Sequence, residues 1–280
     1  MTVHQSALSL SQVHYHARNT IKVTKHKAMH TMNSSDIPPF ETTFAVPLSC
    51  ESCIKDVSTS LYKLPGIHNV SADLESQLIS ITGNAPPSAI VKAIEDTGRD
   101  AILRGSGKKG EEAAVCILET HASHVRDGVR GLIRMVQVGD NLTIADVTVK
   151  GVKAGEYRIT IREAGDISRG AASAGGVWDA VQARKEGRQG VKGAFGTVTV
   201  GQSGLGSVFL HRPVKIWEMI GRSFVVTRQE EGKFEKDDED TLVGVIARSA
   251  GVWDNDKTVC SCSGKTVWEE RKEQRGKGML

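Results

Sequence analysis

Hydrophobic residues follow two different periods along the chain, and the change falls near residue 105. In residues 52–64 and 86–96, apolar side chains recur every three or four positions, which is typical of helices with one buried face. Pro65 and Gly66 would end the first of these helices, and Pro86 and Pro87 would begin the second. Short apolar runs at 42–46, 70–74, 78–81 and 101–103 predict strands. The resulting order, βαββαβ, indicates an α+β domain of ferredoxin-like fold over residues 41–104.

The second half of the chain alternates apolar and polar residues with a period of two. Its glycine-bounded runs predict an all-β domain, a sandwich or barrel, over residues 113–250. The candidate strands are 113–119, 131–138, 143–149, 155–162, 196–200, 223–228 and 242–247. A glycine-rich run within residues 105–112 predicts a flexible linker between the two domains. The acidic run 235–240 predicts a solvated loop.

Both ends of the chain are polar extensions. Residues 1–35 contain no Asp or Glu, so we expect residues 1–40 to be either a disordered tail or a mitochondrial targeting segment. A start at Met29 or Met32 is a further alternative. Residues 251–280 are too few to form a core and are expected to be a flexible tail.

Composition narrows the function classes. Hydrophobic residues make up 39% and charged residues 25% of the 280 positions, as in ordinary globular proteins. A net charge of +3 is too small to indicate a nucleic-acid partner. No stretch approaches the roughly 20 apolar residues that a membrane span needs.

Four of the five cysteines lie in two close pairs. The pairs are Cys50 with Cys53 and Cys260 with Cys262, whereas Cys116 has the spacing of a buried strand residue and is expected in the core. Close pairs indicate metal or redox chemistry in a reducing compartment rather than a disulfide scaffold.

The first pair, Cys50 and Cys53, is placed where a strand leads into a helix. Two soft thiolates suit Cu(I), whereas Zn(II) prefers four ligands, so we expect copper and no zinc. A thioredoxin-type redox pair and a structural disulfide are the alternatives, since Cys-x-x-Cys alone separates none of them. In the second pair, a single intervening residue would strain a disulfide, so both thiols would remain available for metal or for thiol exchange.

Residues 44–103 resemble the heavy-metal-associated domain, whose motif is Met-x-Cys-x-x-Cys. Leu48 stands at the methionine position, followed by Cys50 and Cys53. The resemblance implies that both cysteines are metal ligands and that Leu48 packs beneath their loop, where leucine can replace methionine.

Residues 113–247 resemble Cu,Zn superoxide dismutase, a Greek-key β-barrel. The likeness lies in residues 114–118, 155–166, 221–226 and 242–246. In the alignment, none of the metal-ligand positions considered holds a ligand: they hold Thr160, Arg162, Val177, Ala194 and Thr227. Ala171 and Val243 replace the cysteines of the internal disulfide. Because both metal sites require imidazole and carboxylate ligands, the chain is not expected to be an enzyme with dismutase activity.

Residues 244–253 and 259–271 resemble the tail of copper chaperones for superoxide dismutase, so residues 41–272 are similar to that family in its fungal form. The resemblance implies delivery of Cu(I) to a metal-free dismutase, with Cys50, Cys53, Cys260 and Cys262 as metal ligands. It also implies a transient mixed disulfide between the tail and the partner, an upstream copper donor, and a heterodimer with the dismutase, with a homodimer also possible. The expected location is the cytoplasm, with a fraction in the mitochondrial intermembrane space. Positions carried over for docking are Gly165, Asp166, Ile220, Gly221 and Ile246. A dithiol oxidoreductase and a passive copper store are the rival functions.

Overall fold

The computed structural model describes residues 37–107, 112–235 and 237–249, with residues 265, 266, 268, 269, 272 and 273 near the end of the chain. The predictions for residues 1–36 and for Cys260 and Cys262 concern positions outside the described residues.

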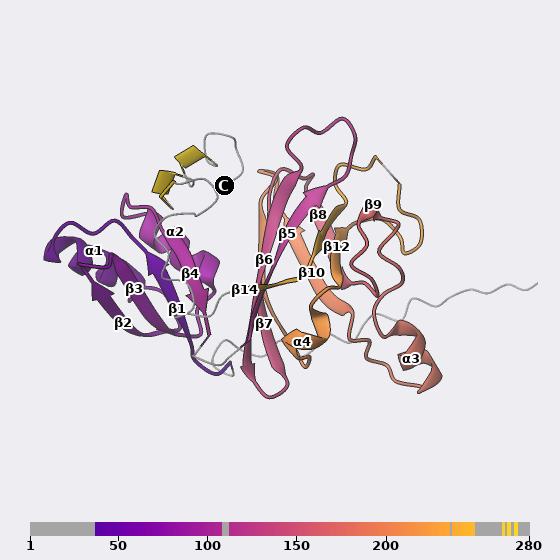
Figure 1. Ribbon diagram of the computed structural model, residues 1–280, viewed down its shortest axis with the longest axis horizontal. Helices are drawn as coiled ribbons and strands as arrows, with labels where there is room; N and C mark the ends of the chain where they lie inside the picture. The colour runs from indigo at the N-terminus through magenta and orange to yellow at the C-terminus, as the bar shows by residue number, and fades with distance from the viewer. Residues whose placement is uncertain are drawn as a thin grey trace, which may run out of the picture. The chain divides into compact units, whose positions relative to one another are not determined.

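The first domain consists of a four-stranded antiparallel sheet and two helices (Figure 1). Its elements are β1 (Phe40–Ala45), α1 (Glu51–Leu61), β2 (Ile67–Asp73), β3 (Leu78–Gly83), α2 (Pro87–Glu95) and β4 (Ile102–Ser106). The strands lie in the order β2-β3-β1-β4, which confirms the predicted ferredoxin-like fold.

The core of this domain forms because each helix turns one apolar face inward. In α1 that face carries Cys53, Val57 and Leu61, at intervals of four residues, and these side chains join one hydrophobic cluster with residues of the sheet. After α1 the chain turns at Gly66, whose φ of +87° favours glycine. A Cβ atom there would lie 2.2 Å from Asn84 Oδ1, so the turn also needs the missing side chain.

The second domain is a closed antiparallel barrel (Figure 1). Its strands are β5 (Ala113–Thr120), β6 (Val129–Gly139), β7 (Leu142–Val149), β8 (Gly155–Ile161), β9 (Ser168–Ala171), β10 (Ala194–Val200), β11 (Gly206–Arg212), β12 (Ser223–Thr227), β13 (Leu242–Val245) and β14 (Ala247–Ser249), with short helices α3 (Ala180–Lys185) and α4 (Ile216–Met219). The sheet runs β13-β12-β8-β10-β11-β7-β6-β5, and β13 also pairs with β5, which closes the ring of eight strands. The predicted barrel is thereby confirmed.

Alternation along β5 shows how the barrel core is built. Ala114, Cys116 and Leu118 are buried in the core cluster, whereas Ile117 between them is 52% exposed. The prediction that Cys116 is a core residue is confirmed, and burial raises the pKa of its thiol to about 12. Gly244 allows β13 to approach this strand, since a Cβ atom there would lie 1.9 Å from Ile117 O.

Three details of the sequence prediction need correction. The strands β9 and β11 were not predicted, nor were the helices α3 and α4, which are too short for a periodic signal. The predicted linker begins inside β4, because Gly105 and Ser106 pair with Thr43 and Thr42 of β1.

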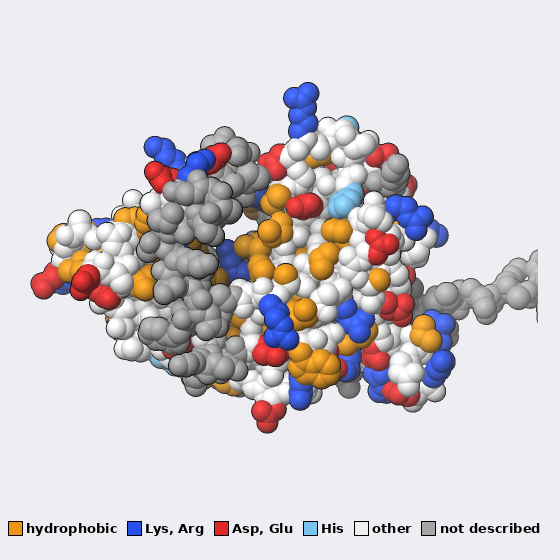
Figure 2. Space-filling model, in the orientation of Figure 1, with side chains coloured by type: hydrophobic (Ala, Val, Ile, Leu, Met, Phe, Trp, Pro, Cys, Tyr) orange, Lys and Arg blue, Asp and Glu red, His pale blue; other side chains and the backbone are white. Residues whose placement is uncertain are grey.

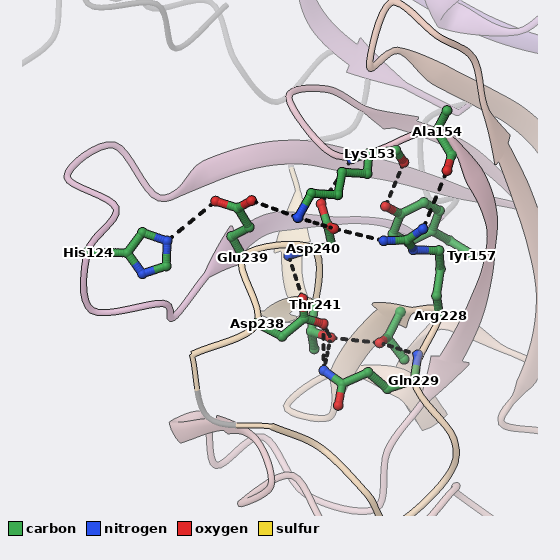
Figure 3. Close-up of polar contacts among 11 residues, drawn as sticks. His124, Lys153, Ala154, Tyr157, Arg228, Gln229, Asp238, Glu239, Asp240 and Thr241 are labelled. Carbon is green, nitrogen blue, oxygen red and sulfur yellow. Dashed lines mark hydrogen bonds and ion pairs between the residues drawn. The ribbon is translucent and has the colours of Figure 1, made fainter.

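The acidic run 235–240 is a loop, and its described residues Glu235 and Asp237 are exposed as predicted, but its last residue is buried. Asp240 is 3% exposed, and its carboxylate accepts a hydrogen bond from Lys153 N (2.9 Å) and pairs with Arg228 (2.9 Å) (Figure 3). Glu239 in turn bridges Lys153 and His124. This end of the run is therefore tied to the barrel by ion pairs between segments that are distant in sequence.

Candidate metal centre

The dithiol of Cys50 and Cys53 lies at the start of α1. Cys50 is the N-cap residue with extended backbone (φ −163°, ψ 169°), and its carbonyl accepts the N–H of Cys53 at 3.0 Å. This turn brings the two Sγ atoms to 3.5 Å from each other. Cys50 is exposed, whereas Cys53 is 9% exposed. One side chain of the pair therefore faces solvent, and the other packs against the domain.

Two serines flank the sulfur atoms. Ser49 Oγ lies 3.3 Å from Cys53 Sγ, and Ser52 Oγ lies 2.9 Å from Cys50 Sγ. The hydroxyl of Ser49, followed by the side chain of Arg99, lowers the pKa of Cys53 to about 6. At neutral pH the Cys53 sulfur is accordingly a thiolate, which is the form that binds metal.

Arg99 supplies the positive charge of the site. Its side chain hydrogen-bonds Cys53, which raises the arginine's own pKa, and its Nη2 pairs with Asp56 at 3.3 Å. Nη1 donates to Thr97 O at 3.2 Å, which fixes the guanidinium between α1 and the turn after α2. Sequence analysis did not find Arg99 or Ser49, because only the fold brings Arg99 next to the cysteine loop.

Leu48 lies beneath the cysteine loop as the resemblance implies. It is 3% exposed and belongs to the same hydrophobic cluster as Cys53 and Val57. Its carbonyl accepts a hydrogen bond from Gln77 Nε2 at 3.5 Å. Leucine therefore fills the space under the loop with an apolar side chain and offers no ligand atom.

The barrel brings together four of the positions that align with metal ligands. Thr160 of β8 pairs with Ala194 of β10, and Arg162 forms an isolated bridge with Val177. None of these side chains is an imidazole or a carboxylate. In the described part of the chain, no group of three or more His, Cys, Asp or Glu side chains is arranged to hold a metal ion.

Arg162 places a guanidinium in this region. The residue is 1% exposed, and its side chain donates to both carboxylate oxygens of Glu231 (2.8 and 2.5 Å) and to Gly175 O. Its Cζ also lies 5.3 Å from the centroid of the Phe234 ring. An internal cation thus ties β8 to the segment after β12.

The two positions aligned with disulfide cysteines are neighbours in space. Ala171 and Val243 belong to one hydrophobic cluster with Ala174 and Val225. The barrel therefore packs apolar side chains where the dismutase alignment has a sulfur bridge.

The positions expected for docking meet around two glycines. A Cβ atom on Gly165 would lie 2.2 Å from Gly221 O and 3.6 Å from Val245 Cγ1, so these three residues are in contact. The side chain of Ile246 is 1% exposed and lies in the core, whereas its carbonyl accepts the N–H of Gly221 at 2.9 Å. The neighbouring Val245 is 39% exposed and faces outward. Asp166 is exposed and Ile220 is half-buried.

Two family profiles match the chain. The heavy-metal-associated domain matches residues 43–100, and copper/zinc superoxide dismutase matches residues 129–249. A superoxide dismutase 1 copper chaperone of Saccharomyces cerevisiae is 42% identical over 84% of this chain and 95% of its own length. The corresponding protein of Debaryomyces hansenii is 45% identical over 86% of this chain and 98% of its own length. The chain belongs to the family of superoxide dismutase copper chaperones.

This copper chaperone is also similar to a mouse protein named copper chaperone for superoxide dismutase, at 32% identity over 81% of the chain and 88% of the mouse protein. Its family members are named chaperones, so the barrel belongs to a metallochaperone rather than to an active dismutase. Among the described residues, no helix is both long and apolar enough to cross a bilayer.

Proposed function

We propose that this copper chaperone binds Cu(I) through Cys50 and Cys53 and delivers it to a metal-free Cu,Zn superoxide dismutase. The observation that carries the proposal is the surface dithiol, with its sulfur atoms 3.5 Å apart and with Ser49 and Arg99 beside Cys53, which lower the pKa of its thiol. Soft thiolates select monovalent copper over hard cations. Zinc is not expected, since it prefers four ligands and the described residues around the pair offer two sulfurs.

The two cysteines differ in exposure, and this difference supports release of the metal as well as its capture. Cys53 is held by Ser49 and Arg99, whereas Cys50 is exposed and open to an incoming thiol. A partner thiolate could therefore replace Cys50 on the metal while Cys53 remains bound. A passive copper store would gain nothing from this exposure.

Docking is proposed to use an exposed hydrophobic surface of the barrel, here called the docking patch: Ile117, Gly165, Trp217, Gly221 and Val245. The flanking pairs Val243–Glu119 and Ala247–Val115 place Val245 across from Ile117. Ile117 is 52% and Trp217 58% exposed.

Hydrophobic side chains are visible among polar ones over this region of the barrel, near β5 and α4 (Figure 2). Exposed apolar side chains around close-packed glycines are suited to a flat protein interface. The same surface could serve a homodimer, because two-fold partners of similar fold use the same patch.

The tail pair Cys260 and Cys262 is proposed to receive the ion or bind it jointly, and to form a mixed disulfide with a cysteine of the partner. A second partner thiol then attacks that bond, which leaves the partner's internal disulfide closed and the tail reduced. Formation of the mixed disulfide from two thiols releases two protons and two electrons, and an oxidant such as molecular oxygen has to accept these electrons; the exchange that follows involves no net oxidation. We further propose an upstream copper donor, and residence in the cytoplasm with a fraction in the mitochondrial intermembrane space.

An anaerobic Cu(I) titration of the reduced full-length chain tests the proposal. Uptake of one or two ions per chain is expected, with loss of the corresponding ion in Cys50→Ser/Cys53→Ser. Disulfide turnover on insulin without Cu(I) binding would instead support the oxidoreductase.

Delivery is tested separately with metal-free dismutase as the partner. The chaperone should be captured by it and should restore its activity when loaded with copper. The variant Cys260→Ser/Cys262→Ser should still be captured but should fail to activate the partner. Full activation by that variant would remove the tail from the mechanism.

A further inference from the structure

Trp178 lies in the barrel core and attracts two cationic side chains. It is 9% exposed and belongs to the main core cluster. Arg222 Cζ lies 4.6 Å and Lys192 Nζ lies 5.3 Å from the ring centroid. Tryptophan is the strongest of the aromatic partners for a cation at such distances. The indole therefore helps to fix the position of both long side chains.

The backbone around Trp178 holds the ring in one place. Its N–H donates to Ile161 O at 2.9 Å, and its carbonyl accepts the N–H of Gly193 at 3.1 Å. A Cβ atom on Gly193 would lie 2.6 Å from Ile161 O and 2.8 Å from Trp178 N. Glycine is thus required for this close approach, and Trp178 is attached firmly to β8.

Arg222 connects the indole to both glycines of the docking patch. Its Nη1 donates to Glu163 O at 2.8 Å, two residues before Gly165. Its Nε donates to Glu218 O at 2.9 Å, and its own backbone follows Gly221 directly. The guanidinium that stacks on Trp178 therefore fixes the two backbone segments that meet in the patch.

Lys192 connects the indole to α4, which carries Trp217 of the docking patch. Its ammonium group pairs with one carboxylate oxygen of Glu218. The other carboxylate oxygen accepts the N–H of Lys215 at 3.2 Å, as the N-terminal cap of α4. Through Lys192, Trp178 also stabilises the short helix that presents Trp217.

We propose that Trp178 is a positioning residue for dismutase docking, acting through Arg222 and Lys192 on the docking patch. The segment that begins at Val177, aligned with a metal ligand of the enzyme, then serves to support a protein interface. This inference rests on the proposed function, in which the barrel binds a metal-free dismutase. According to this inference, a buried residue that is not part of the interface affects the affinity for the partner.

The test measures the dissociation constant of the full-length chain for metal-free dismutase by calorimetry. Trp178→Leu should weaken binding about tenfold, which corresponds to about 1.4 kcal/mol. Trp178→Phe retains an aromatic face and should recover most of the affinity. Val181→Ala, a matched control at a 58% exposed position of α3, should bind as the wild type does.

A purely structural role is excluded by two further readouts. Lys192→Met leaves the indole and the core intact and removes one ion pair with Glu218, so the melting temperature of its barrel should fall by only a few degrees. Its binding should nevertheless be about threefold weaker, because one of the two links is lost. The amide resonances of Gly165 and Gly221 should shift in the free Trp178→Leu chain. Cu(I) uptake by Cys50 and Cys53 should not change.

The outcomes separate the two proposals. If the wild-type chain fails to bind the dismutase, the proposed docking function is wrong. If the wild type binds and Lys192→Met and Trp178→Leu bind equally well, the positioning role of Trp178 is wrong. Should Trp178→Leu fail to fold, Lys192→Met and Trp178→Phe decide the question.

Discussion

Cys53 and Arg99 illustrate what single residues contribute to the proposed copper site. The thiolate at Cys53 exists at neutral pH because a hydroxyl and a guanidinium face the sulfur. Arg99 is itself oriented by Asp56 and Thr97, so groups from α1 and from the turn after α2 position the guanidinium next to the sulfur atom. The sequence predicted the cysteine pair from its spacing, but a guanidinium brought in by tertiary folding leaves no local pattern.

Replacing Arg99 by methionine should raise the pKa of Cys53 above its value of about 6. Loss of the guanidinium removes a group that favours the thiolate, so less thiolate is present at pH 7 and alkylation slows. The rate of iodoacetamide reaction is measured against pH in a Cys50→Ser background, where the midpoint should move to higher pH.

Lys92→Met is the matched control for this substitution. Lys92 is exposed and pairs with Asp96 rather than with the cysteine loop, so the midpoint should stay at the value of the Cys50→Ser parent. An unchanged midpoint in Arg99→Met would show that Ser49 alone holds the thiolate.

At the scale of elements, ion pairs connect strands and loops of the barrel that are far apart in the chain. Arg162 at the end of β8 and Glu231 after β12 form a bidentate pair. Asp240 is likewise held by Lys153 and Arg228 from other segments. Like-charged runs in a sequence give no indication of such partners, which explains why the burial of Asp240 was not predicted.

Strand β11 was missed for a different reason. Its residues Gly206–Arg212 lack a clean alternation, since most of its side chains are half-buried. The pairing with β7 over the whole strand, from Gly206–Val149 to Arg212–Thr143, defines it instead. Strands with strict alternation, such as β5 and β8, were predicted correctly within a residue or two.

Glu231→Gln should lower the free energy of unfolding of the barrel by about 1–2 kcal/mol. The substitution leaves the buried guanidinium of Arg162 without a charged partner; the cost is moderate because the Glu231 side chain is 50% exposed. Urea unfolding followed by tryptophan fluorescence measures it. All four tryptophans, Trp178, Trp217, Trp253 and Trp268, lie outside the first domain.

Adding Arg162→Met to Glu231→Gln should recover part of this loss, because an apolar side chain of similar length leaves no unpaired charge. Glu230→Gln, whose parent carboxylate pairs with the exposed Lys233, is the control. Wild-type stability in Glu231→Gln would mean that the ion pair does not stabilise the barrel.

On the scale of the whole molecule, the chain combines two domains of different fold, and a different role is proposed for each. The ferredoxin-like fold and the barrel were both predicted from the period of hydrophobic residues, and their family from motifs at Cys50 and in the strands. The sequence did not predict which side chains come together inside the barrel. Arg162 and Val177 are brought together by a single bridge, and Trp178 stands beside them with its two cations.

The thermal unfolding of the barrel should be insensitive to reductants and to chelators. Ala171 and Val243 stand at the disulfide positions, and Cys116, the single cysteine of the described barrel, is buried. Melting curves recorded with and without TCEP and EDTA should agree within about 1 °C, since no bond or ion is removed. A clear fall with either reagent would reveal a cross-link or metal that contributes to the fold.

The apolar packing of Ala171 and Val243 also affects when the barrel reaches its final structure. An immature dismutase has neither its ions nor its sulfur bridge, whereas a barrel closed by aliphatic packing is complete as soon as the chain has folded. In the proposed complex, the chaperone would therefore present a fully folded barrel to a partner that is not yet mature. If the proposed docking holds, maturation has a defined direction, because only one of the two similar barrels would change its covalent state during their encounter.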